Sequence, residues 1–372
     1  MKGIIFWACS NCRSTMAFYQ ALAKQLNVPM VVAIWFTKNG TCAVRSELGF
    51  RSDEFTNLEM IAVGENYRKG LEILDAHPGW HNLFGVYQGA SNYQKLIEEC
   101  KRRGLKAGVI CEAPCNMSSG FKRLLKTAYL KWILPRTVKR AVRFADFFVN
   151  LSGDATKWVR NNGWTDKKII PFGYYPPAIE GTKPVLRTTN KPFHILATGK
   201  LSKYRGADVL VKALVLLKQW GIPYQATITQ KGELMPILKR YVEKYSLPVN
   251  LAGFMEIKTL NRLYETCSVF VGAGRDEPWG MRLNDVLQCG VPMVVSRGMG
   301  GVQLVDYHRC GMTFEREDHV DLANKLRHLA LDESYYKACA ENAFAAAEKI
   351  TPTVMAAKLI GEINSRFPHW FD

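Results

Sequence analysis

A chain of 372 residues is longer than one typical hydrophobic core needs, and it suits two domains of ordinary size. Apolar residues make up 48% and charged residues 22%, a balance that excludes an extensively disordered protein. The formal net charge is +17, with the larger basic excess in residues 1–180, so the expected partners are anionic: nucleotide phosphates, anionic lipid or nucleic acid.

Membrane-spanning and secretory segments are not expected. The chain holds no run of about 18 or more uncharged apolar residues, which a transmembrane helix requires. The run from Met1 to Trp7 is short and lacks the longer apolar core of a signal peptide, so it indicates a first strand. Ten cysteines without a dense framework fit a reducing compartment. We therefore expect a cytoplasmic protein.

In the first half, short apolar runs alternate with amphipathic stretches, which indicates parallel strands covered by helices. Strands are expected at residues 3–8, 30–36, 83–88, 108–112, 145–151 and 168–172. Helices are expected at residues 14–25, 93–103 and 155–162. The apolar pattern then lapses between Pro176 and Pro192, which is typical of an interdomain linker.

The alternation restarts after this lapse. Strands are expected at residues 193–197, 225–230, 249–252, 269–273 and 292–296, and a short apolar run follows at 312–314. Helices are expected at residues 207–220, 235–245, 259–265, 281–289, 320–330, 333–349 and 352–367. The pattern predicts a first domain over residues 1–178 and a second over residues 190–350, each with ligands at the carboxyl ends of its strands.

Two cysteine pairs and one histidine pair have spacings that redox or metal sites use. Both cysteine pairs follow expected strands, so their thiolates could form a redox pair or a zinc site, although ordinary buried thiols are the simpler interpretation. Pro78 and Gly79 break any helix between His77 and His81, so a loop is favoured over a metal site there. The four cysteines are Cys9, Cys12, Cys111 and Cys115.

The segment from Gly199 to Gly206 lies between an expected strand and an expected helix. It places Lys200 and Arg205 at the carboxyl end of the strand, beside a helix N-terminus. Such a place suits a diphosphate, which accepts charge-assisted hydrogen bonds from cations and from backbone amides. Taken alone, the segment is better explained as a solvated basic loop.

Residues 274–285 also follow a strand and open a helix. Glu277 is in the loop and Asp285 in the helix, so the two carboxylates can address different parts of one extended ligand. A carboxylate on a helix face can accept hydrogen bonds from a pair of ribose hydroxyls, and one in the loop can accept them from a sugar ring. Helix capping explains an acid near a helix start, but it does not explain the Pro-Trp-Gly between the two.

A third glycine-rich segment follows the strand expected at residues 292–296. Its adjacent glycines, Gly300 and Gly301, let the backbone approach a ligand closely and present amides, although a simple turn would use the same residues. The three segments thus form a consistent set of ligand-facing loops on neighbouring strand ends.

Together these segments resemble the family 4 glycosyltransferases, retaining enzymes of the GT-B fold. The resemblance covers the second half of the chain and includes that family's E-x7-E element, here Glu277-x7-Asp285. It implies an α/β protein with two Rossmann-like doubly wound domains that face a central cleft. It also implies that residues 351–372 cross back to the first domain.

The resemblance implies a role for each residue of a donor site. Glu277 would be the catalytic-site acid that contacts the hexose hydroxyls beside the reacting carbon, and Asp285 would hold the ribose hydroxyls. Lys200 and Arg205 would clasp the diphosphate, in interchanged order relative to the family. The remaining implied contacts are Gly300 and Gly301 near the distal phosphate and sugar, and Phe254 and Met255 at the base.

The first half resembles the family more weakly. Residues 9–13 stand where the family has a glycine-rich loop, and Glu112 occupies the position of a frequent histidine. Arg13 and Glu112 are therefore the candidates for the acceptor side. The implied partners are a nucleotide sugar and a saccharide or lipid-linked saccharide acceptor, and neither a metal ion nor another cofactor is expected.

Residues 121–143 form a basic amphipathic segment. Apolar residues recur at helical spacing from Phe121 to Ile133, basic residues lie opposite, and no acid occurs between Glu112 and Asp146. A helix of this kind suits an anionic membrane surface. A core helix with a solvated basic face fits the same pattern.

We therefore expect a metal-independent retaining transferase that moves a hexose from a nucleotide-diphosphate sugar to an acceptor hydroxyl. Its setting would be bacterial surface polysaccharide, lipopolysaccharide or glycolipid assembly, at the inner face of the cell membrane. A nucleotide-sugar epimerase of the same fold would turn over the donor without an acceptor. A basic nucleic-acid-binding protein would not explain Glu277 and Asp285, so nucleic acid is not an expected partner.

Overall fold

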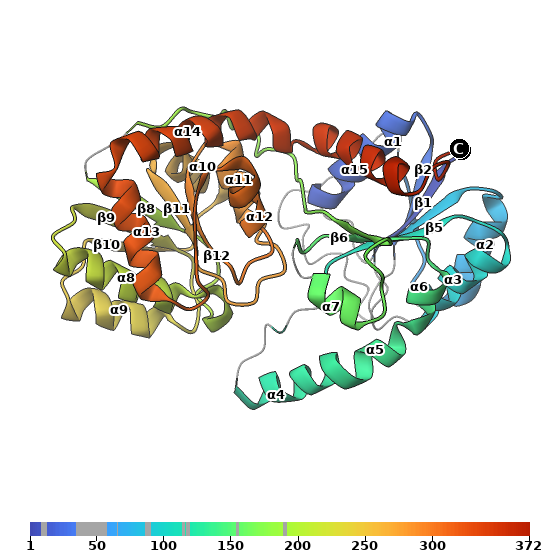
Figure 1. Ribbon diagram of the computed structural model, residues 1–372, viewed down its shortest axis with the longest axis horizontal. Coiled ribbons are helices and arrows are strands. Elements are labelled where there is room, and N and C mark those ends of the chain that lie inside the picture. The colour runs from blue at the N-terminus through green and yellow to red at the C-terminus, as the bar shows by residue number, and fades with distance from the viewer. Residues whose placement is uncertain are drawn as a thin grey trace. The chain divides into compact units, whose positions relative to one another are not determined.

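The computed structural model describes residues 1–8, 13–34, 58–64, 66–85, 91–113, 116, 120–153, 156–188 and 192–372. They form two units, each built on a parallel sheet covered by helices (Figure 1). The first unit comprises Met1–Pro114, Leu124–Pro177 and Pro352–Asp372, and the second comprises Cys115–Arg123 and Ala178–Thr351.

The sheet of the first unit has the strand order β3-β2-β1-β4-β5-β6-β7, and every pairing in it is parallel. Two of its inner strands, β1 and β2, are runs of fully buried apolar residues, as expected where helices cover both faces. The order reverses between β1 and β4, so a crevice is expected at their carboxyl ends. The strands are β1 (Ile4–Ala8), β2 (Met30–Ile34), β3 (Leu58–Ala62), β4 (His81–Phe84), β5 (Ala107–Cys111), β6 (Phe148–Asn150) and β7 (Ile169–Pro171).

Helices of the first unit include the last helix of the chain. This helix, α15 (Pro352–Arg366), buries Met355, Leu359 and Ile363 and packs against α1 (Arg13–Leu26). Apolar residues four apart lie on one helix face, which explains how a C-terminal helix covers this sheet. The others are α2 (Tyr67–Ala76), α3 (Ser91–Arg102), α4 (Gly120–Ala128), η3 (Tyr129–Ile133), α5 (Leu134–Thr137), α6 (Lys139–Phe144) and α7 (Thr156–Asn161), of which α4 spans the boundary with the second unit.

The sheet of the second unit has the order β10-β9-β8-β11-β12-β13, again with parallel pairing throughout. The order reverses between β8 and β11, which makes their carboxyl ends the expected ligand position. The strands are β8 (Phe193–Ala197), β9 (Tyr224–Thr229), β10 (Val249–Gly253), β11 (Val269–Gly272), β12 (Met293–Ser296) and β13 (Gly311–Phe314).

Two helices of the second unit begin at an aspartate that caps the helix N-terminus. The Asp318 side chain accepts hydrogen bonds from two backbone amides of the first turn of α13, and the Asp332 side chain accepts one from α14. The helices are η4 (Lys203–Arg205), α8 (Ala207–Gln219), α9 (Met235–Lys244), α10 (Ile257–Thr266), α11 (Arg282–Gln288), α12 (Val302–His308), α13 (His319–Leu331), α14 (Glu333–Ala347) and η5 (Glu348–Ile350).

The two doubly wound parallel sheets confirm the predicted fold class. Two elements of the first unit were not predicted: β3 and α2. β3 has the mixed sequence LEMIA with only its first residue buried, because it is the edge strand of the sheet, and so it lacks the apolar run of a central strand. β4 begins two residues before the predicted strand because His81 and Asn82 are buried polar residues.

The predicted linker is only partly a linker. Arg187 is buried, and its guanidinium donates hydrogen bonds to the carbonyl oxygens of Tyr264, Glu265 and Cys289, at the C-terminal ends of α10 and α11. Free carbonyls at a helix end attract a cation, so this arginine anchors the segment to the second unit. The change from one unit to the other falls between Pro177 and Ala178.

Candidate active site

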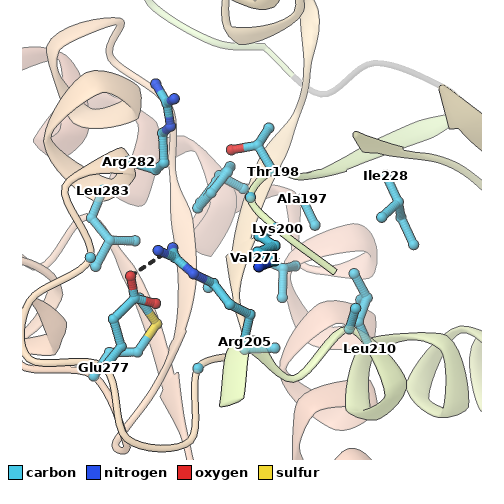
Figure 2. Close-up of a pocket in the computed structure, with 18 of the residues that line it drawn as sticks. Ala197, Thr198, Lys200, Arg205, Leu210, Ile228, Val271, Glu277, Arg282 and Leu283 are labelled. Atoms are coloured by element: carbon cyan, nitrogen blue, oxygen red, sulfur yellow. Dashed lines mark ion pairs between the residues drawn. The ribbon is translucent and has the colours of Figure 1, made fainter. Parts of the chain in front are cut away.

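A pocket lies at the carboxyl ends of β8 and β11, where the strand order of the second unit reverses. The loops that follow these two strands line it (Figure 2). Residues of α8, β9 and α11, and Met299, complete the lining. Three of the residues predicted for the site meet here: Lys200, Arg205 and Glu277. The fold thus brings together two sequence segments about 70 residues apart, as a doubly wound sheet does at its switch point.

Arg205 and Glu277 form an ion pair across the pocket. The Nη1 atom of Arg205 lies 2.7 Å from the Oε1 atom of Glu277, whose side chain is only 7% exposed (Figure 2). The Arg205 guanidinium is also 5.3 Å from the centre of the Tyr204 ring, which limits its rotation. Lys200 is exposed, and within the described residues its ammonium makes no ion pair, so it presents a full positive charge to a ligand.

Arg275 joins the two loops, and its role was not predicted. Its guanidinium forms a fork with Asp208, with both N–O distances 2.8 Å, and also contacts Glu317 and the carbonyl oxygen of Lys203. Burial would raise the pKa of Asp208, but the hydrogen bonds from Arg275 lower it below its ordinary value. Arg275 thus fixes the turn that carries Arg205.

The glycine segment holds the Glu277 loop in place. The Glu277 amide donates to the carbonyl oxygen of Gly298, and the amides of Gly300 and Gly301 donate to the carbonyl oxygens of Glu277 and Trp279. Glu277 and Met299 therefore form an isolated parallel bridge. Both glycine amides predicted to face a phosphate already have backbone acceptors, and the phosphate contact stays a prediction.

The Pro-Trp-Gly between the two acids has a structural explanation. Trp279 is 1% exposed, and its Nε1 donates to the amide oxygen of Asn284, which is fully buried at the start of α11. The buried indole thus anchors the loop to the helix. Gly280 follows with a φ of 96°, a left-handed conformation that favours glycine.

Asp285 is not among the residues that line the pocket; Arg282, three residues before it, is. The Nη1 atom of Arg282 donates to the Oδ2 atom of Asp285 at 2.9 Å, and the Asp285 side chain is 14% exposed. Burial raises the pKa of Asp285, against the opposing charge of Arg282. Opposite charges three residues apart at a helix start were the available sequence signal for this pair.

Phe254 and Met255 follow β10 and do not line the pocket. The Phe254 side chain is 68% exposed, and Met255 is half-buried. An exposed aromatic ring beyond a strand's carboxyl end offers a flat apolar surface on which a planar base can stack. Their predicted contact with a base stays a prediction.

Candidates of the first unit lie partly outside the described residues. Arg13 begins α1, just after β1, and its side chain is not described. Glu112 follows β5 and accepts a hydrogen bond from Tyr174; burial, with the nearby Glu112 charge, raises the pKa of that tyrosine. Arg13 and Glu112 thus both follow the carboxyl ends of strands, where the acceptor side was predicted.

The cysteine and histidine hypotheses find no support among described residues. Cys9, Cys12 and Cys115 lie outside the described part of the chain, and Cys111 ends β5. His77 bonds to the carbonyl oxygen of Ile73, and His81 to that of Trp370. Within the described ranges, no group of three or more His, Cys, Asp or Glu side chains is placed to hold a metal ion.

Comparison with known families identifies the second unit. Residues 179–346 match the family described as glycosyl transferases group 1. The match covers less than half of the chain, and it falls on the unit that holds the pocket. The matched range includes Lys200, Arg205 and Glu277.

Curated relatives are similar over part of their length. The amylovoran biosynthesis glycosyltransferase AmsK of Erwinia amylovora is 26% identical over 153 residues, which are 39% of this chain and 38% of AmsK. A GDP-mannose-dependent alpha-(1-6)-phosphatidylinositol dimannoside mannosyltransferase of Mycobacterium tuberculosis is 28% identical over 182 residues, 44% of this chain and 47% of that enzyme. The chain thus matches less than half the length of these relatives.

Solved structures resemble the whole chain. The crystal structure of HepE from Anabaena in complex with UDP superposes with a TM-score of 0.67 and 15% identity, and covers 98% of this chain and 100% of that one. At this identity the likeness shows the fold, which is GT-B with two Rossmann-like sheets.

Proposed function

We propose that this protein is a retaining, metal-independent glycosyltransferase of the family 4 type, which moves a hexose from a nucleotide-diphosphate sugar to an acceptor hydroxyl. The observation that carries the proposal is the convergence of Lys200, Arg205 and Glu277 in one pocket at the switch point of the group 1 domain. The two cations suit the diphosphate of a nucleotide sugar, and the buried carboxylate beside them suits the hydroxyl groups of its sugar ring.

The reaction forms a bond between the sugar's reacting carbon and the acceptor oxygen, whose proton passes to the leaving diphosphate. It breaks the bond between that carbon and the diphosphate oxygen, so negative charge builds up on the diphosphate. Lys200 and Arg205 stabilise that charge, which lowers the barrier without a metal ion. Glu277 accepts hydrogen bonds from the hexose hydroxyls and orients the ring. The acceptor hydroxyl binds on the side of Arg13 and Glu112.

The donor nucleotide lies along the pocket toward β10. Its ribose lies at the Arg282–Asp285 pair, the distal phosphate and sugar lie at the Gly300–Gly301 turn, and its base stacks near Phe254 and Met255. The Anabaena structure contains UDP, and the Mycobacterium relative is named for GDP-mannose. Uridine and guanosine diphosphate sugars are therefore the first donors to test.

Surface polysaccharide, lipopolysaccharide or glycolipid assembly is the proposed setting, since the similar proteins include enzymes named for amylovoran biosynthesis and for a phosphatidylinositol mannoside. The proposed acceptor is a saccharide or a lipid-linked saccharide. The segment around α4 and η3 would place the enzyme on an anionic membrane surface: its apolar stripe is exposed, with Phe121 72%, Leu124 67% and Trp132 58% exposed. Among the described residues, no helix is long and apolar enough to span a membrane.

The proposal is tested by a thermal-shift screen of the full chain with UDP-, GDP- and ADP-sugars and with the free nucleoside diphosphates. A ligand that binds the folded state raises Tm in proportion to the logarithm of its concentration over Kd. We expect one base to stabilise the wild type, and Lys200→Ala to weaken that binding about 10- to 100-fold, the loss expected for a charge-assisted contact.

Lys203→Ala is the matched control, because this exposed lysine lies three residues away in the same loop and does not line the pocket. It should bind the donor as the wild type does. Failure of every nucleotide sugar to stabilise the wild type would overturn the proposal. Release of an isomerised sugar nucleotide from donor alone, without an acceptor, would instead identify an epimerase.

A further inference from the structure

Arg282 occupies the place in the pocket where an acid was predicted. It opens α11 and lines the pocket, whereas Asp285, one helical turn later, lies behind it. Figure 2 shows the Arg282 side chain extending away from the Arg205–Glu277 pair, on the side where Thr198 is drawn. The pocket therefore has a second cationic end, separate from Lys200 and Arg205.

Two neighbouring side chains hold this half-buried guanidinium. Asp285 accepts one of its N–H groups at 2.9 Å, and Tyr264 lies close enough to raise its pKa. Tyr264 is fully buried, and its hydroxyl lies 3.4 Å from the hydroxyl of Thr198, which also lines the pocket. Burial alone would lower the pKa of Arg282, but its neighbours Tyr264 and Asp285 raise it, so the guanidinium stays charged.

The chemistry of the two groups assigns them different tasks. A guanidinium has five N–H donors, and the contacts with Asp285 and Tyr264 leave others for a ligand in the pocket. The Asp285 carboxylate is already engaged, and it is one methylene shorter than the glutamate expected there. Ribose hydroxyl oxygens and phosphate oxygens both accept hydrogen bonds from a guanidinium.

We propose that Arg282 is a donor-contacting residue, which binds the ribose-phosphate end of the nucleotide through its guanidinium, and that Asp285 is the positioning residue that aims it. This inference rests on the proposed function, because the ligand is the nucleoside diphosphate of the donor. In this proposal the ribose is not bound directly by the Asp285 carboxylate. It is bound by Arg282, which Asp285 holds in place.

The test is a double-mutant cycle of nucleoside diphosphate binding to the full chain, measured by isothermal titration calorimetry with UDP, GDP and ADP. Arg282→Ala should weaken binding about 10- to 100-fold, as loss of a charge-assisted contact does. Asp285→Asn should weaken binding several-fold in the wild type and should have no further effect in Arg282→Ala, because it acts only through the arginine.

Arg282→Lys keeps the buried carboxylate paired, so this variant should fold, and it should still bind several-fold more weakly because an ammonium lacks the guanidinium fork. Asp285→Glu, which can still hold the guanidinium, should restore binding relative to Asp285→Asn. Arg262→Ala, at an exposed arginine of α10 outside the pocket, is the matched control and should bind as the wild type does.

If Asp285 bound the ribose directly, the expected affinities of the variants would be the opposite. Arg282→Ala and Arg282→Lys would then bind as tightly as the wild type or more tightly, and Asp285→Asn would be equally harmful with or without Arg282. That pattern would overturn the inference while leaving the proposed function intact. Failure of the wild type to bind any of the three nucleotides would instead remove the proposed function itself.

Discussion

At the scale of single residues, the Arg205–Glu277 pair neutralises one cation of a pocket that Lys200 and Arg282 also line. The carboxylate is buried, and the arginine that would bind the diphosphate neutralises it at 2.7 Å. In the proposed donor complex, a diphosphate would compete with Glu277 for the same guanidinium, so the two acidic partners of Arg205 would oppose each other energetically. The proposal therefore assigns Glu277 to orienting the sugar, at the expense of tight nucleotide binding.

Glu277→Gln separates these two effects. The substitution keeps the size and hydrogen-bonding capacity of the side chain but removes its charge, so Arg205 is released toward the diphosphate. We expect the Kd for the free nucleoside diphosphate to stay the same or fall, while kcat for sugar transfer falls about 100-fold or more because orientation in the transition state is lost. Calorimetry and steady-state kinetics measure the two quantities. An equal loss in both would show that Glu277 serves binding alone.

At the scale of elements, the start of α8 depends on a close backbone approach to the end of β11. Gly206 caps this helix with a φ of 70°, and a Cβ atom built on it would lie 1.9 Å from the carbonyl oxygen of Ala273. No side chain fits that space, so the loop that carries Arg205 and the loop that carries Glu277 are in direct contact.

Gly206→Ala should therefore lower the free energy of unfolding of the second unit by about 2–4 kcal/mol, from the left-handed conformation and from the overlap with Ala273. Gly221→Ala is the matched control: Gly221 has a φ of 69°, but nothing lies within 4 Å of its added Cβ. That variant should lose only about 1 kcal/mol. Urea unfolding of both variants measures the difference, and equal losses would contradict a steric role for the approach.

The elements also show what a single sequence can predict. Alternation of apolar runs and amphipathic stretches predicted the parallel sheets, because a strand covered on both faces must be apolar throughout. It missed β3, an edge strand that pairs only with β2 and has a single buried residue. The meeting of Lys200, Arg205 and Glu277 followed from their places at strand ends.

Other details depend on contacts that spacing does not reveal. The amides of Gly300 and Gly301 donate to carbonyl oxygens of the Glu277 loop, a contact between separate segments that the glycine pattern does not predict. The place of Arg282 in the pocket depends on its hydrogen bond to Asp285, which the spacing of the two acids does not predict.

At the scale of the whole molecule, part of the net charge of +17 lies on an exposed helical segment. The segment α4, η3 and α5 is nearly continuous and helical (Figure 1), and the apolar side chains that a core helix would bury are exposed along it. The interpretation as a core helix is therefore wrong for residues 121–133, and Leu134 is the first buried residue beyond them. A basic, apolar surface of this kind matches an anionic bilayer, where apolar side chains enter the interface and lysines meet lipid phosphates.

Replacement of Leu124, Leu125 and Trp132 by Ser should lower partitioning of the protein onto phosphatidylglycerol vesicles about tenfold or more, because each side chain loses about 1 kcal/mol or more of interfacial burial. Val320→Ser with Leu331→Ser is the control, since both residues are exposed on α13. Vesicle sedimentation measures the effect. The wild type should bind phosphatidylcholine vesicles weakly, and it should dissociate from phosphatidylglycerol vesicles as the salt concentration rises. Equal binding by the triple variant, or a preference for duplex DNA over vesicles, would contradict membrane docking and would assign the basic surface to another anionic partner.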